Sequence, residues 1–377
     1  MLRREDGLLA RPRFDACPVP DALSQTPCPP ERLPSPLAIA LPDDGLAARA
    51  LAPKRSTPSI VVAAKLATLV ERNVPGWTSE VIRAAQSDEP AVRAAAIWHI
   101  GSYGSREGLV WAVDVLEREV RAGLAWRAVE ALRYLTGQDL GRDAAAWRES
   151  IDALPLDWTA AQVRGVTAWG TPVDASVADL TKFDPRSDRL GVVVHLAAPP
   201  PAKDERPKPN TRRERVIAAR GGGTARSTIT TDDVLDALRA SFRLAPAAAQ
   251  VHPIGAGVTA ARLSDEPSSL SALDLDAMFA LFEATDTAPE GDLYAALGAA
   301  LAVRDVDRIL LVTRGGPCGG EHAELELIVD LVLQHAKFRH LVFDVVLVDP
   351  PEPSVAQLKR LAEATRGRCL RVTPNKR

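Results

Sequence analysis

Three short stretches of the sequence carry residue types that could do chemistry. Residues 321–324 read Glu-His-Ala-Glu and place a histidine between carboxylates, but the second histidine of a His-Glu-x-x-His metal motif is missing. Residues 221–224 read Gly-Gly-Gly-Thr and could cradle a phosphate, but no Gly-Lys-Ser/Thr follows. Residues 212–215 read Arg-Arg-Glu-Arg and could contact an anionic partner. We interpret the first stretch as a solvated helix start and the other two as parts of a solvated, flexible loop.

The other histidine and cysteine positions complete no catalytic or zinc site either. His195 lies in an apolar run, which is typical of a histidine at the end of a buried strand. The cysteines lack the Cys-x-x-Cys spacing of zinc sites; they are Cys17, Cys28, Cys318 and Cys369. Cys17 and Cys28 could pair in an oxidising compartment, but we expect isolated thiols. Because the sequence has no Ser-His-Asp or Cys-His arrangement, it predicts neither an enzyme nor a cofactor.

The composition indicates a folded chain of more than one domain. It has 377 residues, of which 46% are hydrophobic and 25% charged, so a packed core is expected. The net charge of -3 gives no basic field for binding nucleic acid or an anionic membrane. There is no 18-residue apolar run and no signal-peptide core after Met1, so we expect a cytoplasmic protein without a membrane span. A misassigned start site could hide a leader peptide.

The elements that would position functional residues fall into four regions. Residues 1–56 are rich in proline, and we expect them to be largely disordered. Residues 57–154 have apolar positions at helical spacing, and residues 155–187 form a connector. Residues 188–377 alternate strand and helix patterns. All seven tryptophans lie between Trp77 and Trp169, which predicts separate hydrophobic cores for the helical region and the α/β region.

The helical region contains an internal match. Residues 92–95 (Val-Arg-Ala-Ala) correspond to residues 126–129 (Trp-Arg-Ala-Val) at an offset of 34 residues, which is near the unit length of helical-hairpin repeats. Gly137 predicts a helix end and Asp143 the cap of the next helix. Residues 88–96, an acidic turn followed by Val-Arg and small residues, resemble a HEAT repeat of the kind found in bacterial proteins. The alternative is a plain helical bundle.

The second half predicts a doubly wound, mostly parallel, Rossmann-like sheet. Ligands of such sheets bind at the carboxyl ends of the strands, so the loops after these ends deserve most interest. We expect strands at 190–197, 248–255, 306–313, 343–348 and 368–372, with helices at 231–242, 270–284, 291–303, 321–336 and 354–366.

The order of these elements resembles the von Willebrand factor type A (vWA) domain. The similarity rests on residues 291–297 (Gly-Asp-Leu-Tyr-Ala-Ala-Leu), on the strand and loop at 306–317, and on a leucine-alanine helix at 358–364 followed by Gly367. It spans about residues 188–374. The resemblance implies a fold class of α plus α/β, in which a short HEAT-like array precedes a vWA-like domain.

The resemblance also implies where a metal-ion-dependent adhesion site should lie. Family members place Asp-x-Ser-x-Ser after the first strand, a threonine before the tyrosine-containing helix and an aspartate after the fourth strand, because a hard divalent cation requires oxygen ligands. In this chain these ligand positions fall on Leu196, Ala198, Pro200, Gly291 and Arg314, and the family's Ser-Asp-Gly around the last of them reads Thr313-Arg314-Gly315. Asp292 is adjacent, and we interpret it as a helix cap. Since Arg314 would repel a cation, the resemblance implies a degenerate site without metal.

We therefore expect a non-enzymatic scaffold that binds a protein partner through the helical repeats or the metal-independent vWA-like domain, with no nucleic-acid or membrane partner. One alternative is a domain that still binds a divalent cation through Asp204, Asp286 and Asp292. Another is a hydrolase with a site in the loop at 199–227. In the scaffold that we expect, the degenerate positions, including Asp292 and Arg314, are the candidate binding surface, and Arg314 could attract an acidic partner residue.

Overall fold

The computed structural model describes residues 59–373, except for 102, 161–168, 198–228, 265, 272, 287–290, 304–305, 317–318, 321–323 and 337–338. All described residues belong to one compact unit. The proline-rich segment at 1–56 therefore lies outside the described residues, as do Cys17, Cys28 and Cys318. In the part of the chain that the structure covers, no helix has the length and apolar character needed to span a membrane.

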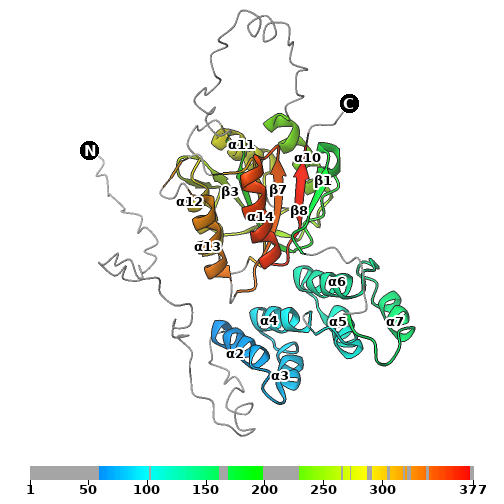
Figure 1. Ribbon diagram of the computed structural model, residues 1–377. Helices are drawn as coiled ribbons and strands as arrows, with labels where there is room; N and C mark the ends of the chain where they lie inside the picture. The colour runs from blue at the N-terminus through cyan, green and yellow to red at the C-terminus, as the bar shows by residue number, and fades with distance from the viewer. Residues whose placement is uncertain are drawn as a thin grey trace, which may run out of the picture. The chain divides into compact units, whose positions relative to one another are not determined.

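The described helices of the N-terminal part pack together into what we call the helical array (Figure 1). They are α2 (Ser59–Glu71), α3 (Trp77–Ala84), α4 (Pro90–Ile100), α5 (Arg106–Arg118), α6 (Ala122–Thr136) and α7 (Ala144–Asp152). Consecutive helices pack against each other from α2 to α6, and α2 with α4, α4 with α6, and α5 with α7 pack as well. The apolar residues at helical spacing thus pack between short helices that are arranged in layers.

The ends of α6 and α7 have the geometry that the sequence predicts. Gly137 ends α6 in the left-handed conformation with φ 74°, which costs a glycine little. The Asp143 side chain accepts a hydrogen bond of 3.0 Å from the Ala146 backbone N–H and begins α7. Both predicted helix boundaries are confirmed.

The C-terminal part is built on one sheet. Its strands are β1 (Pro172–Ala175), β2 (Arg189–His195), β3 (Gln250–Ala256), β4 (Ala260–Arg262), β5 (Ser268–Ser269), β6 (Arg308–Thr313), β7 (Val342–Val348) and β8 (Cys369–Val372). The strand order is β1-β8-β7-β6-β2-β3-β4, with β5 also paired to β3. Only β4 and β5 run antiparallel to β3, so the prediction of a mostly parallel sheet is confirmed.

Helices cover both faces of the sheet (Figure 1). They are α8 (Val177–Leu180), α10 (Thr231–Leu244), α11 (Leu275–Asp286), α12 (Leu293–Ala302), α13 (Leu325–Ala336) and α14 (Glu352–Ala364). Val193 of β2 joins a cluster with α12, α13 and α14, whereas its neighbours Val192 and Val194 join one with α8, α10 and α11. This alternation follows from the two-residue period of a strand. The apolar cluster of the helical array is separate from both.

The connector at 155–187 holds more structure than the sequence indicates. It contributes β1, an edge strand parallel to β8, and the short helix α8. Neither has a clear sequence pattern, because β1 includes Pro172 and Asp174 and α8 has only four residues. The helix expected from 270 begins only at Leu275, since Ser268–Ser269 pair with β3.

Candidate functional site

The carboxyl ends of β2 and β6 form the topological switch point of the sheet. β2 is central, with β3 on one side and β6 on the other, and all three run parallel. The chain leaves β2 toward β3 and later returns to β6 on the opposite side. Ligands of open α/β sheets bind at such a point, which makes this edge, the carboxyl edge, the first place to look for a site.

A buried pair of side chains forms the floor of the carboxyl edge. Nδ1 of His195, at the end of β2, lies 3.1 Å from the Thr313 hydroxyl, at the end of β6. Both residues are buried, with exposed fractions of 1% and 0%. The Thr313 hydroxyl oxygen also accepts a hydrogen bond of 3.1 Å from the Gly315 N–H. The hydroxyl of Thr313, which belongs to the predicted degenerate site, is therefore engaged by protein groups.

Arg314, which follows Thr313 at the same edge, binds two backbone carbonyls. Its Nε donates to the Leu196 carbonyl at 3.0 Å, and one Nη donates to the Ile229 carbonyl at 3.0 Å. These bonds hold the end of β2 and the start of α10 together. The guanidinium is thus held in place, because two of its nitrogens donate to backbone carbonyls. This weakens the expectation that Arg314 reaches out to an acidic partner.

Gly291 and Asp292 also lie at the carboxyl edge. A Cβ on Gly291 would lie 2.9 Å from the His195 ring, so a threonine at this position would require that ring to move. The Asp292 carboxylate accepts a hydrogen bond of 2.8 Å from the Ala295 N–H and begins α12. The predicted role of Asp292 as a helix cap is confirmed. Its carboxylate lies against Gly320, where an added Cβ would be 2.4 Å from Asp292 Cγ.

The structure brings Leu196, Gly291, Asp292, Thr313 and Arg314 to the carboxyl edge. Other candidates lie outside the described residues: Ala198, Pro200, Asp204, and the stretches at 212–215, 221–224 and 321–323. The side chain of Asp286 is also outside the description. Within the described part of the chain, no three or more histidine, cysteine, aspartate or glutamate residues are grouped so that they could hold a metal ion.

The opposite, amino edge of the sheet carries a buried network of charges. Arg308, the first residue of β6, is only 1% exposed and lies between two carboxylates. It donates to Asp344 of β7 at 2.9 Å, and to both oxygens of Glu130 of α6 at 2.9 and 3.0 Å. Arg186 and Arg368 extend the network, to Glu130 at 3.4 Å and to Asp344 at 2.5 Å. These charges join the helical array to the sheet, so we call this interface the seam.

The electrostatics of the seam follow from this pairing. Burial alone would raise the pKa of Asp344, but Arg308 and Arg368 hold it well below its usual value. Burial likewise opposes the charge of Arg308, yet Asp344 and Glu130 raise its pKa. Removing one partner of a buried ion pair destabilises the fold, because the charge that remains is buried without an opposite charge beside it.

A second group of contacts at the seam involves aromatic side chains. The Arg366 guanidinium stacks 3.9 Å over the Trp98 ring and donates to the Trp98 carbonyl at 2.6 Å. The ring of His340, which follows α13, lies close to those of Trp98 and His99, with centroids 5.3 and 6.0 Å away. Burial, together with Arg366, lowers the pKa of His99 to about 4. Burial also lowers the pKa of His340 to about 3.

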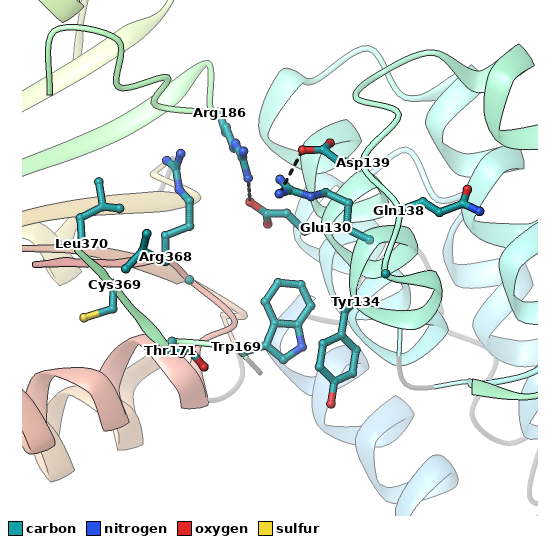
Figure 2. A pocket seen from close by; sticks show the side chains of 15 residues that line it. Glu130, Tyr134, Gln138, Asp139, Trp169, Thr171, Arg186, Arg368, Cys369 and Leu370 are labelled. Atoms are coloured by element: carbon teal, nitrogen blue, oxygen red, sulfur yellow. Dashed lines mark hydrogen bonds and ion pairs between the residues drawn. The ribbon is translucent and has the colours of Figure 1, made fainter. Parts of the chain in front are cut away.

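A cavity of about 360 Å³ opens beside the seam. Figure 2 shows Arg186 pointing to Glu130 on one side of it, and the rings of Tyr134 and Trp169 next to each other on another. These rings are stacked with centroids 5.0 Å apart. Each arginine that lines this cavity has an acidic partner; Arg133, for example, pairs with Asp139 at 3.1 Å. The cavity is therefore better suited to stacking against the aromatic rings than to pairing with a charge.

Sequence reasoning missed the seam. A signal for it was present, because Arg308 and Asp344 each lie inside a run that otherwise predicts a buried strand. Charged residues are almost never fully buried unless they are paired. What the sequence could not supply was the third partner, Glu130, which lies 178 residues before Arg308.

Comparisons with known proteins add no family to this description. No protein-family model matches the chain, and no curated protein is significantly similar to it.

Proposed function

We propose that this chain is a non-enzymatic scaffold that binds a protein partner, with a HEAT-like helical array and a vWA-like domain whose metal site is degenerate. The proposal includes a cytoplasmic location, no cofactor, and no nucleic-acid or membrane partner. Two features of the fold support it. Layered short helices, with helices two apart packed together, suit a repeat array. A doubly wound sheet with its switch point between β2 and β6 suits a vWA-like domain.

The observation that carries the proposal is the position of Arg314. Its guanidinium is bound to the Leu196 and Ile229 carbonyls at the carboxyl edge, where a metal-binding relative would have a carboxylate. A cation bound next to this group would meet strong repulsion. The Asp292 carboxylate at the same edge is engaged as a helix cap. The residues present therefore favour recognition without metal.

The first test uses the full chain as an affinity bait in a lysate of the source organism, with and without EDTA. Each captured protein is then purified, and its binding to the chain is measured by calorimetry in Mg²⁺ and in EDTA. We expect a stoichiometric partner whose affinity is the same in both buffers. The full chain is needed, because a cut between the helical array and the sheet would separate Glu130 from Arg308 and leave buried charges unpaired.

The same experiment distinguishes the alternatives. Affinity lost in EDTA, together with thermal stabilisation of the chain by Mg²⁺ or Mn²⁺, would favour a cation bound through Asp204, Asp286 and Asp292. A captured small-molecule or peptide substrate that is turned over by the purified chain would overturn the non-enzymatic assignment and direct attention to the loop at 199–227.

A further inference from the structure

β1 is the last strand at one end of the sheet (Figure 1). It runs parallel to β8, with Val173 opposite Leu370 and Asp174 opposite Arg371. On its other side, which we call the outer side of β1, no described strand pairs with it. The outer side of an edge strand presents backbone N–H and carbonyl groups that another strand can bind.

The hydrogen bonds to β8 show which backbone groups lie on the outer side. Successive residues of a parallel strand form their ladder hydrogen bonds on alternate sides. The Thr373 N–H donates to the Ala175 carbonyl at 3.4 Å, so the backbone groups of Ala175 and Val173 lie on the β8 side. The outer side therefore presents the N–H and carbonyl of Asp174 and the carbonyl of Pro172. Pro172 fits this assignment, because proline has no N–H and occurs in sheets mainly at edge strands.

The cavity of about 360 Å³ beside the seam opens at the amino end of β1. Trp169 and Val173 line it from this end of the strand, and Tyr134 lines it from α6 (Figure 2). The side chains of Val173 and Tyr134 are accessible, with exposed fractions of 52% and 38%. An accessible apolar side chain and an accessible aromatic ring in one cavity favour a ligand with an aromatic ring, which packs on the first and stacks against the second.

Asp174 gives the outer side of β1 a negative charge. Its side chain is exposed and forms no ion pair with any residue in the described part of the chain. Arg371, which lies opposite it in the register, pairs with Glu352 at 2.6 Å. Opposite charges on neighbouring strands attract each other, so the exposed carboxylate favours a strand that carries a basic residue.

We propose that an extended segment of a protein partner binds as an additional strand on the outer side of β1 and inserts an aromatic side chain into this cavity. Its backbone forms hydrogen bonds with Asp174 and with the Pro172 carbonyl, and a lysine or arginine lies beside the Asp174 carboxylate. Because two outward residues offer few hydrogen bonds, the aromatic side chain supplies much of the affinity. The inference rests on the proposed scaffold function and assigns its binding surface to β1 and the cavity.

The test is calorimetric titration of the full chain with two blocked hexapeptides of alternating threonine and valine that carry one tryptophan and one lysine side by side. Lysine precedes tryptophan in one peptide and follows it in the other, so both strand directions are covered. We expect one of them to bind with one-to-one stoichiometry in the micromolar to millimolar range, on the order of 10–1,000 μM. Alanine in place of tryptophan should weaken binding at least about tenfold. Prolines in place of the threonines should abolish it, because proline supplies no N–H to β1.

Variants of the chain decide where the peptide binds. Asp174→Ser removes only the exposed charge and should weaken binding by no more than about threefold. Asp174→Pro also removes the outward N–H and should weaken it about tenfold further. Tyr134→Ala should weaken binding about tenfold. Its matched control is Tyr103→Ala, at a ring that stacks on Trp111 with centroids 5.3 Å apart, and it should change binding by less than about twofold. Thermal melts establish that each variant is folded.

Three results would overturn the inference. They are failure of both hexapeptides to bind, equal effects of Asp174→Pro and Asp174→Ser, and binding of N-acetyltryptophanamide as tight as that of the peptide, which would need no added strand. If Asp174→Pro does not fold, the proline-containing peptide decides the same question on the wild-type chain. The scaffold function fails separately, when the full chain captures no stoichiometric partner. A captured partner that binds Asp174→Pro and Tyr134→Ala as tightly as the wild type would overturn only the assignment to β1.

Discussion

At the carboxyl edge of the sheet a single arginine, Arg314, is bound to backbone carbonyls, whereas at the amino edge Arg308 is bound to two carboxylates from different parts of the chain. The carboxyl edge is where ligands of doubly wound sheets usually bind, yet its arginine stabilises two neighbouring loops. The amino edge usually has no ligand, yet it holds the most deeply buried charges described here. The difference teaches that the buried charges of this molecule join its two parts, whereas the charge at the carboxyl edge stabilises neighbouring loops.

The largest effect should come from removing one charge of the seam. Glu130→Leu leaves Arg308, Arg186 and Arg368 with only Asp344, and should lower the free energy of unfolding by about 3–5 kcal/mol. Urea denaturation of the full chain measures this loss in the free energy of unfolding. Glu130→Leu combined with Arg308→Leu should recover much of the loss, since Asp344 keeps Arg368.

The matched control for this prediction is Asp330→Asn, which breaks a solvent-exposed ion pair with Arg360. This substitution should lower the free energy of unfolding by less than about 1 kcal/mol, because water screens the attraction between exposed charges. Equal losses for Glu130→Leu and Asp330→Asn would mean that burial adds nothing at the seam, and the contrast between the two edges would lose its energetic basis.

Acid should weaken the seam through its histidines. The pKa values of His99 and His340 are lowered to about 4 and about 3, so the unfolded chain takes up these protons first as the pH falls below 6.5. Their contribution to stability is complete above pH 6.5 and is lost as the pH falls to about 4 for His99 and to about 3 for His340, by roughly 3 kcal/mol for His99 at most. The measurement is the urea midpoint against pH for the wild type and for His99→Gln with His340→Asn.

Asparagine suits position 340 because His340 has a left-handed backbone with φ 50°. The difference in urea midpoint between the wild type and the double variant should shrink from pH 7 to pH 4, because only the wild type has the two histidines. Carboxylates that titrate in the same range are common to both proteins and cancel in this difference. A difference that stays constant with pH would show that these histidines are not protonated on unfolding in this range, contrary to their burial.

A substitution at the carboxyl edge should reduce stability less than one at the seam. Arg314→Met removes the hydrogen bonds to the Leu196 and Ile229 carbonyls and should cost about 2 kcal/mol. Hydrogen exchange should speed up locally, at the end of β2 and the start of α10, while the amides of α6 stay protected. If Arg314→Met leaves stability unchanged but abolishes partner binding, the guanidinium acts in recognition and the two edges differ in function instead of strength.

The smallest effect should be at the cap of α12. Asp292→Ala removes the acceptor of the Ala295 N–H and should cost about 1 kcal/mol, while Asp292→Asn keeps an acceptor and should be nearly neutral. Thermal melts with and without Mg²⁺ measure both effects. Stabilisation of the wild type by Mg²⁺ that disappears in both variants would show that Asp292 is a metal ligand, which would restore a cation to the carboxyl edge.

Much of the fold was predictable, because its signals are local. The valine-rich run that becomes β2, the glycine that ends α6 and the aspartates that begin α7 and α12 each depend on a few neighbouring residues. β1 was not predictable from local pattern, since a four-residue strand with proline and aspartate becomes a strand only through its pairing with β8.

The residues proposed for the degenerate site, among them Leu196, Gly291 and Arg314, lie at one edge of the sheet. Their hydrogen-bond partners could not be predicted from the sequence. That the Arg314 nitrogens bind the Leu196 and Ile229 carbonyls could not be known, because backbone acceptors leave no mark in a sequence. At the seam, the charges of Arg308 and Asp344 inside apolar runs were a local signal, but their partner Glu130 lies 178 residues before Arg308 and could not be identified from the sequence.

The sequence separation within the seam also bears on how the protein is made. Glu130 leaves the ribosome 178 residues before Arg308, which at about 5–20 residues per second is a delay of roughly 10–35 s. During that time the nascent helical array has its full set of helices but carries an acidic side chain whose partner has not been synthesised. The array must therefore tolerate a solvated Glu130 during translation and gain its final stability only when β6 emerges, so that premature termination before Arg308 releases a product with an exposed docking face.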